Sequence, residues 1–168
     1  MSVDARVEPL TGKVPAMTWR WDVETDILSG SFKGGGKTTG LTGTIELTDE
    51  EGSIAVLDVA SGAIRGLDVV VWPEVTTVPD LAPPAPDQDG KVVVPARPSR
   101  PGIASLEVDT SLTMSTNPAE SVFHLRIGAR RSVRLIRVAD HLLIEIDTKH
   151  RLAGFWLVGV PKFVPEDE

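Results

Sequence analysis

The chain has 168 residues, 41% of them hydrophobic, and carries 17 basic and 24 acidic side chains for a net charge of −7 at pH 7. This length is enough to bury one good core, or two small units packed together, without covalent cross-links. The absence of cysteine excludes a disulfide scaffold, thiol chemistry and thiolate zinc sites.

The predicted elements are nearly all β-strands. In the first half of the chain, residues 53–58 and 63–71 predict a hairpin around Ala60-Ser61-Gly62, because runs of Val, Leu and Ile flank a turn-forming tripeptide. In the second half, residues 132–139 and 141–147 predict its counterpart, with a tight break at Ala139-Asp140. No window shows the long 3.6-residue period of an amphipathic helix.

A glycine-rich segment before the first hairpin, Lys33 to Gly40, has part of the pattern of a phosphate-binding loop. Gly36, Lys37 and Thr38 fit that pattern. However, Ser31 stands where the loop needs its first glycine, and the residues that follow predict a strand instead of the helix whose N-terminus would hold phosphate. We interpret the segment as a hairpin loop and expect no nucleotide cofactor.

Residues 76–104 predict a proline-rich linker between a first unit at 14–75 and a second unit at 105–164. Prolines remove backbone donors and disfavour both helix and central strand; they stand at Pro79, Pro83, Pro84, Pro86, Pro95, Pro98 and Pro101. The Ala82–Pro86 run should be extended and stiff, either as a plain spacer or as a ligand for a proline-recognising groove. Lys91 to Val94 is compatible with an added edge strand.

The two units share a pattern about 95 residues apart. The spacing from Gly66 to Pro73 equals that from Gly154 to Pro161, and each run follows a strand that ends in an aspartate, Asp58 or Asp147. A glycine inside an apolar strand usually marks a bulge or a close backbone approach. Because two copies are too few for a solenoid, the pattern predicts duplication of one unit.

Both units resemble a family of uncharacterised bacterial domains, the domain of unknown function family 2283. Its motif is aromatic-Asp-x-x-x-Asp-x-Leu, a variable loop, and then strand-Asp-turn-[Ile/Leu/Val]-x-Gly-[Ile/Leu]-Glu. The first unit matches this motif at Trp21, Asp22, Asp26, Leu28, Asp58, Ile64, Gly66 and Leu67. The second keeps Phe123, Asp147, Leu152 and Gly154, with Asn117 and Ser121 for the early aspartates and Trp156 for the acidic residue. The family has no assigned activity, and some members are similar to antitoxin partners, so the resemblance is compatible with an immunity-type role.

Charge is divided unevenly along the chain. Residues 1–90 carry 6 basic and 15 acidic side chains, net −9, whereas residues 91–168 carry 11 basic and 9 acidic, net +2. Five arginines gather in one predicted hairpin region and form a candidate contact strip for an acidic partner or a second copy: Arg126, Arg130, Arg131, Arg134 and Arg137. The alternative is a solvated edge strand that uses charge to block aggregation. The pI near 5.0 makes nucleic acid an unlikely partner.

Trp156 is the other candidate contact residue. Tryptophan in a strand is most often core or interface. The counterpart of Trp156 in the first unit is the charged Asp68, so Trp156 is predicted to point outward as an exposed aromatic contact.

No residue pattern predicts catalysis or metal binding. The spacings of His124, His141 and His150 match no metal motif. Asp22 and Asp26 have the chemistry of an acid–base pair, but a turn role explains them and their counterparts in the second unit alike. We therefore expect no enzyme activity, no metal and no cofactor.

These observations predict one architecture and two functions. The architecture is all-β, with two antiparallel meander units packed as a pseudo-twofold sandwich or barrel. The first function is a non-enzymatic protein-interaction module, as an assembly subunit or an immunity-type partner. The alternative is a small-ligand binding module with a pocket between the two units.

The first ten residues lack the apolar core of a signal peptide, and no apolar run approaches the roughly 18 residues of a membrane helix, so the expected location is cytoplasmic.

Overall fold

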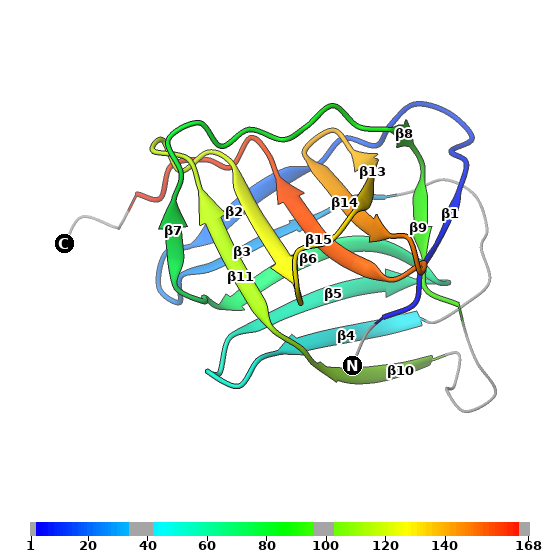
Figure 1. Cartoon of the computed structure of the whole chain (residues 1–168), viewed down its shortest axis with the longest axis horizontal. Helices are drawn as coiled ribbons and strands as arrows, with labels where there is room; N and C mark the ends of the chain where they lie inside the picture. Colours follow the sequence, from blue (N-terminus) through cyan, green and yellow to red (C-terminus); the bar gives the residue numbers. More distant parts are fainter. Residues whose placement is uncertain (1–2, 34–41, 96–102, 165–168) are drawn as a thin grey trace.

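The computed structural model describes residues 3–33, 42–95 and 103–164, and these ranges form an all-β fold (Figure 1). This confirms the predicted fold class. Within these ranges the chain forms no helix, and hence none long and apolar enough to cross a membrane. The glycine-rich segment Lys33 to Gly40 lies, apart from Lys33, outside the described residues, and the strand expected after it is present. The strands are β1 (Arg6–Glu8), β2 (Thr18–Asp22), β3 (Ile27–Ser31), β4 (Thr42–Thr48), β5 (Ile54–Ala60), β6 (Ala63–Val71), β7 (Val75–Thr77), β8 (Gln88–Asp89), β9 (Lys91–Val93), β10 (Ile103–Asp109), β11 (Leu112–Thr116), β12 (Phe123–Ile127), β13 (Val133–Ala139), β14 (Leu142–Asp147) and β15 (Leu152–Leu157).

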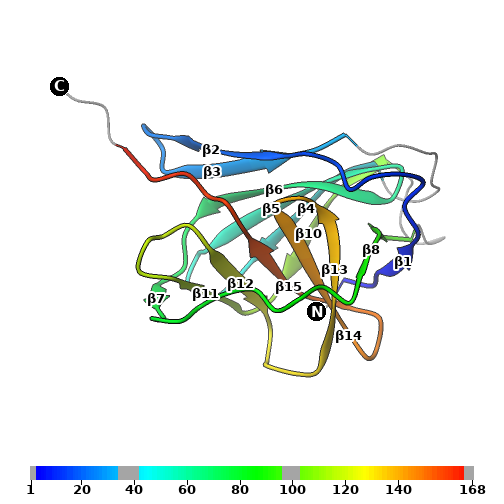
Figure 2. The same ribbon diagram turned by 90° about the horizontal axis from the view of Figure 1, so that it is seen from above.

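The strands form two sheets that pack face to face (Figure 2). The first sheet has the order β1-β9-β6-β5-β4-β10, and the β2–β3 hairpin joins it through β3 and β6. The second has the order β7-β11-β12-β15-β14-β13-β8. Apolar residues alternate along many strands, as at Phe123, Leu125 and Ile127 of β12, so each sheet has a face that is buried. Both faces contribute to one continuous hydrophobic core.

The two predicted units share strand order and register. The first runs β2-β3-β6-β5-β4 and the second β11-β12-β15-β14-β13, with every pairing antiparallel. In each, a hairpin pairs with the last strand of a three-stranded meander, an arrangement that the simple meander prediction did not contain. Gly66 lies opposite Asp58, Gly154 lies opposite Glu145, and a β-bulge follows at the same point in both. The structural counterpart of Asp58 is therefore Glu145 and not Asp147, and the matched registers support the duplication, which stays a prediction.

The segment predicted to be a linker is instead woven into both sheets. β7 adds to β11, β8 adds to β13, and β9 lies between β1 and β6 with Val92 and Val93 buried. The strand expected at Lys91 to Val94 is thus confirmed, although it is not at a sheet edge. Between β7 and β8 the chain runs along the outside of the second sheet, as the green trace in Figures 1 and 2 shows. We call residues 78–88 the strap.

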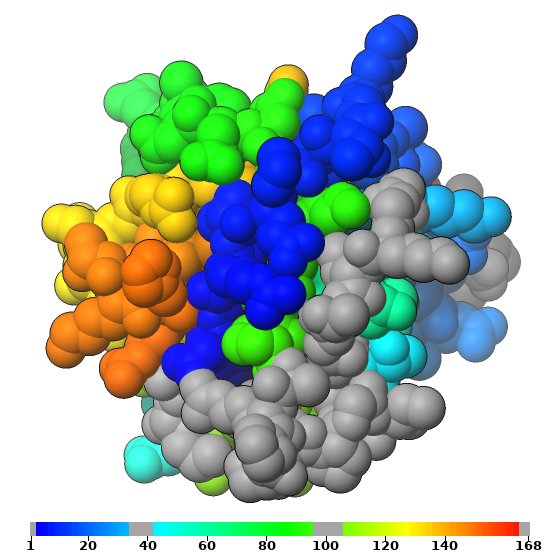
Figure 3. Space-filling model, turned by 90° about the vertical axis from the view of Figure 1, so that its right-hand side faces the viewer, coloured from blue at the N-terminus to red at the C-terminus, as the bar shows by residue number. Residues whose placement is uncertain are grey.

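The N-terminal segment connects the two units along one side of the molecule. Figure 3 shows it in blue, between the orange β14–β15 region and the green β9 region. The Ala5 amide donates to the His150 carbonyl at 2.9 Å, and the Leu152 amide donates to the Val3 carbonyl at 2.8 Å. Val3 and Ala5 are buried. Val3 and Ala5 are therefore part of the second unit's packing.

Candidate functional site

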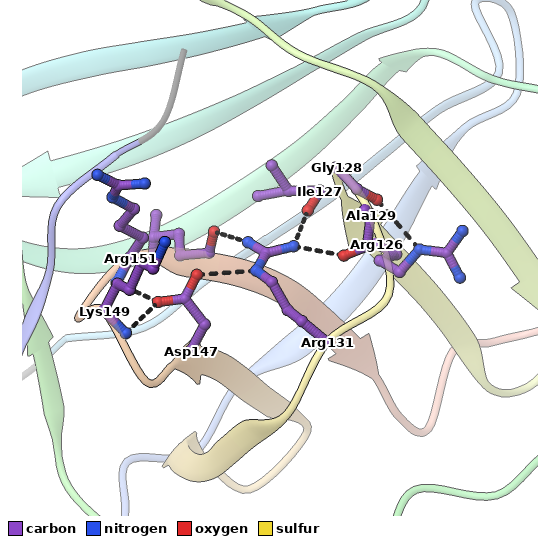
Figure 4. A network of polar contacts seen from close by, with 9 residues as sticks. Arg126, Ile127, Gly128, Ala129, Arg131, Asp147, Lys149 and Arg151 are labelled. Carbon is purple, nitrogen blue, oxygen red and sulfur yellow. Dashed lines mark hydrogen bonds and ion pairs between the residues drawn. The ribbon is translucent and has the colours of Figure 1, made fainter.

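The five arginines of the predicted strip have different structural roles. Arg131 holds the β12–β13 loop to the end of β14 (Figure 4). Its Nε donates to Asp147 Oδ2 at 2.8 Å, and its terminal nitrogens donate to the carbonyls of Ile127, Ala129 and Leu152. Most of its donors are therefore used within the chain, and Arg131 is a structural residue.

Asp147, the partner of Arg131, organises the β14–β15 loop. Its Oδ1 accepts from the amides of Lys149 and Arg151 at 2.9 and 3.0 Å. Burial alone would raise the pKa of Asp147, but the hydrogen bonds from Arg131, Arg151 and Lys149, together with the charge of Arg131, outweigh it and hold the pKa below its ordinary value. The carboxylate is thus ionised through the neutral range.

The remaining arginines separate into a paired one, an exposed one and two that face a cavity. Arg137 forms an ion pair with Asp89 of β8, the residue after the strap, with Nε to Oδ1 at 2.9 Å. Arg134 is exposed on β13. Arg126 and Arg130 line a cavity on the outer face of the second sheet. The predicted single strip is therefore not a continuous surface.

The prediction that Trp156 is an exposed contact residue is wrong, because its side chain is buried at 6% exposure. Its ring stacks on His124 with centroids 4.2 Å apart, and its Nε1 donates to Glu145 Oε2 at 3.2 Å. Trp156 lies opposite His124 on neighbouring strands, as Asp68 lies opposite Ser29 in the first unit. The outward direction was correct, but Leu81 of the strap packs over this face and covers it.

Replacing Leu81 tests whether the strap covers Trp156. We expect Leu81→Ala to destabilise the protein by about 1 kcal/mol, since the leucine is half-buried, and to shift tryptophan emission to longer wavelength as Trp156 gains water. Chemical denaturation and fluorescence spectra of the folded state measure the two effects. Leu10→Ala is the matched control, because Leu10 is also half-buried but packs elsewhere. An unchanged spectrum for Leu81→Ala would contradict the role of the strap.

In the first unit, the face that corresponds to the covered one is acidic. Ser29, Asp58 and Asp68 stand where the second unit has His124, Glu145 and Trp156. Burial raises the pKa of Asp68 above its ordinary value; a hydrogen bond with Ser29 offsets part of this effect, and the Asp58 carboxylate adds to it. The two units thus carry different chemistry at equivalent positions.

An aromatic groove lies between the two units. Trp21 of β2 stacks on Trp72, which follows β6, with ring centroids 5.4 Å apart. Phe163, from the C-terminal segment, meets Trp21 edge-on at 5.2 Å, and Phe123 of β12 lies 5.3 Å from Trp72. These rings come from four separate parts of the chain. They line a cavity of about 320 Å³.

Polar contacts fix the two tryptophan rings and leave ring surface in the groove. Trp21 Nε1 donates to the Pro161 carbonyl at 2.8 Å, and Trp72 Nε1 donates to the Asp26 carbonyl at 2.7 Å. Both indole N–H groups are therefore satisfied. Since neither tryptophan is fully buried, the groove offers aromatic carbon surface and not a free ring donor.

Two exposed acidic residues stand at the wall of this groove, one from each unit. Asp26 closes the β2–β3 turn and Glu120 lies in the β11–β12 turn, and both have positive φ, 60° and 54°. Val75 and Thr77 of β7 complete the wall. Because β7 is the last strand at its end of the second sheet, one of its edges is not covered by another strand of that sheet. The groove thus combines aromatic surface, negative charge and a strand edge.

Sequence reasoning predicted a pocket between the units but did not identify its residues. The general expectation that a tryptophan in a strand is core or interface does not bring Trp21 and Trp72 together, because their approach depends on how β2, β6 and β12 pack in the folded chain. The available signal was the pair of turns after Trp21 and after its counterpart Thr116, which close hairpins of the same register.

No model of a known protein family matches the chain, and no curated protein sequence matches it. The resemblance to the domain of unknown function family 2283 therefore stays a prediction. Among the described residues, no three His, Asp or Glu side chains come together in a way that could hold a metal ion.

Proposed function

We propose that this protein is a binding module that holds a basic segment of a partner protein in the aromatic groove between its two units. The observation that supports this most directly is the juxtaposition of Trp21 and Trp72 with the carboxylates of Asp26 and Glu120. A Lys or Arg side chain over a tryptophan face gains about 0.5–2 kcal/mol from the cation–π interaction. Nearby carboxylates add to the attraction for such a cation.

The uncovered edge of β7 favours a partner segment in an extended conformation. An extended segment can add to an exposed strand edge by main-chain hydrogen bonds while alternate side chains enter adjacent pockets. All three residues of β7 are exposed, and two of them line the groove. The net charge of −7 favours encounter with a basic partner. An assembly subunit or an immunity-type partner would use such a surface, and the absence of cysteine agrees with a cytoplasmic setting.

A free organic cation is the second candidate ligand. If it binds in the groove, the protein is a small-ligand binding module. Its support is the size of the groove, about 320 Å³, which is within the range of small-molecule sites. The same aromatic and acidic groups would recognise it. No catalytic step is part of either proposal.

Titration with a short peptide of alternating Val and Lys, followed by calorimetry, tests the first proposal. We expect Asp26→Asn combined with Glu120→Gln to weaken binding about tenfold, because both carboxylates are lost while the rings remain. Glu50→Gln with Glu51→Gln is the matched control, since it makes the same charge change in the exposed β4–β5 turn.

Titration with tetramethylammonium chloride distinguishes a peptide ligand from a free organic cation. Binding of this ion but not of the peptide would favour the small-cation module and reject the protein partner. Equal peptide affinity in both double variants would reject the groove as the binding site, since general charge would then account for the attraction. Loss of peptide binding only in the groove variant supports the proposal.

A further inference from the structure

The cavity on the outer face of the second sheet is separate from the aromatic groove, with which it shares no lining residue. Its volume is about 270 Å³. Apolar groups line part of it, among them Leu81 of the strap, Val133 and Trp156. Three arginines also line it, Arg126, Arg130 and Arg131, of which Arg131 is already paired with Asp147. The cavity is therefore small, partly apolar and positively charged.

The loop that carries Arg130 is held in place by the chain itself. Gly128 has a φ of 74°, which favours glycine, and its amide donates to the Ser111 carbonyl at 2.8 Å. Arg131 binds the carbonyls of Ile127 and Ala129 on either side of that glycine (Figure 4). Because the backbone of this loop is fixed, only the side chain of Arg130 has to be ordered when a ligand binds.

Arg126 is also oriented in advance. Its Nε donates to the Gly128 carbonyl at 3.2 Å, which leaves its two terminal nitrogens for another partner. Within residues 3–33, 42–95 and 103–164, no carboxylate lies within ion-pair distance of Arg126 or Arg130. The two guanidinium groups thus keep uncompensated charge at a cavity.

The carboxylate of Glu145, which also lines this cavity, forms no ion pair with Arg126 or Arg130. Its Oε1 lies 3.0 Å from His124 Nε2, and its Oε2 accepts from Trp156 Nε1. Each oxygen therefore already has a partner within the wall. At 8% exposure, the group is part of the cavity's structure.

We propose that this cavity binds a small organic anion, a carboxylate with a compact apolar body. The planar carboxylate matches the fork of a guanidinium group, and both Arg126 and Arg130 line the cavity. The apolar body would lie against Leu81, Val133 and Trp156, out of water. This inference is independent of the cationic groove, because it uses different residues and the opposite charge.

Benzoate is the probe, with benzamide as its neutral isostere and inorganic phosphate as an anion without an apolar body. Calorimetry with the full chain is expected to detect benzoate binding and no benzamide binding. Arg126→Gln and Arg130→Gln should each weaken benzoate binding tenfold or more. Arg134→Gln is the matched control, because Arg134 is exposed outside the cavity, and it should leave the affinity unchanged.

Two further measurements keep the test decisive. Leu81→Ala retains both arginines and should still weaken benzoate binding severalfold, since it removes part of the apolar wall. Thermal denaturation of each variant establishes that the fold is intact at the binding temperature. Equal loss in Arg134→Gln, phosphate affinity equal to that of benzoate, or no benzoate binding by the unaltered chain would each overturn the proposal.

Discussion

Replacing Gly154 with alanine is expected to destabilise the protein by about 3 kcal/mol. An added Cβ would overlap Glu145 Oε1 and lie 2.7 Å from the Leu125 carbonyl oxygen. The backbone oxygen belongs to the neighbouring strand β12 and cannot move without disturbing the sheet. The carboxylate is held by His124 and Trp156, so its displacement would break the polar cluster beneath the strap.

Chemical denaturation of Gly154→Ala beside Gly12→Ala measures this effect. Gly12 is the control, because a Cβ there meets no heavy atom within 4 Å and the substitution should be nearly neutral. A loss below about 1 kcal/mol for Gly154→Ala would show that the sheet relaxes easily at this position, contrary to the close packing described above.

Asp147→Asn is the second substitution with a large expected effect, a loss of about 2 kcal/mol at pH 7. The side chain is buried and bonds Arg131, which is 29% exposed, so the loss should be smaller than for a fully buried ion pair. An amide also presents donors where Arg131 needs an acceptor. Urea denaturation at pH 7 measures the change in the free energy of unfolding.

The pH dependence of that change has a defined sign. Because the folded pKa of Asp147 lies below its ordinary value, the stability that its charge provides is present above about pH 4 and is lost as the pH falls through the folded pKa. The difference between the unaltered chain and Asp147→Asn should therefore shrink in acid.

Asp68→Asn is the control, with the opposite expectation. Since the pKa of Asp68 is raised on folding, its charge disfavours the fold at neutral pH, and the substitution should leave stability unchanged or slightly higher. A loss of stability at pH 7 in both variants would indicate a general effect of removing an aspartate.

Local features of this fold could be predicted from the sequence. The hairpins β5–β6 and β13–β14 follow from apolar runs around turn residues, and the structure has both. Gly66 and Gly154 were expected at a bulge or close approach, and in each case an added Cβ would lie within 3 Å of a neighbouring backbone oxygen. These features depend on interactions within one strand pair, and short sequence patterns can predict such interactions.

Features that depend on chain routing could not be predicted. The course of the proline-rich segment is set by its contacts with the second sheet, such as the Asp87 amide donating to the Leu135 carbonyl and the Leu135 amide donating to Asp87 Oδ2. Those partners lie far apart in sequence. Without knowledge of this course, the sequence pattern places Trp156 on the surface and predicts that the proline-rich segment is a spacer. The aromatic groove was missed for the same reason, because its four rings come together only when both sheets are complete.

The way in which the strap and the N-terminal segment reach into the second unit has a kinetic consequence. The parallel pair β8–β13 and the bridge between Asp4 and Arg151 join residues distant along the chain, so long loops must close before these contacts form. Proteins dominated by such pairings fold in about milliseconds to seconds. Because the strap packs on a face formed by β13, β14 and β15, we expect its docking to follow the assembly of these strands. Until the strap docks, the Trp156 face is open to association with other chains, and docking closes that route.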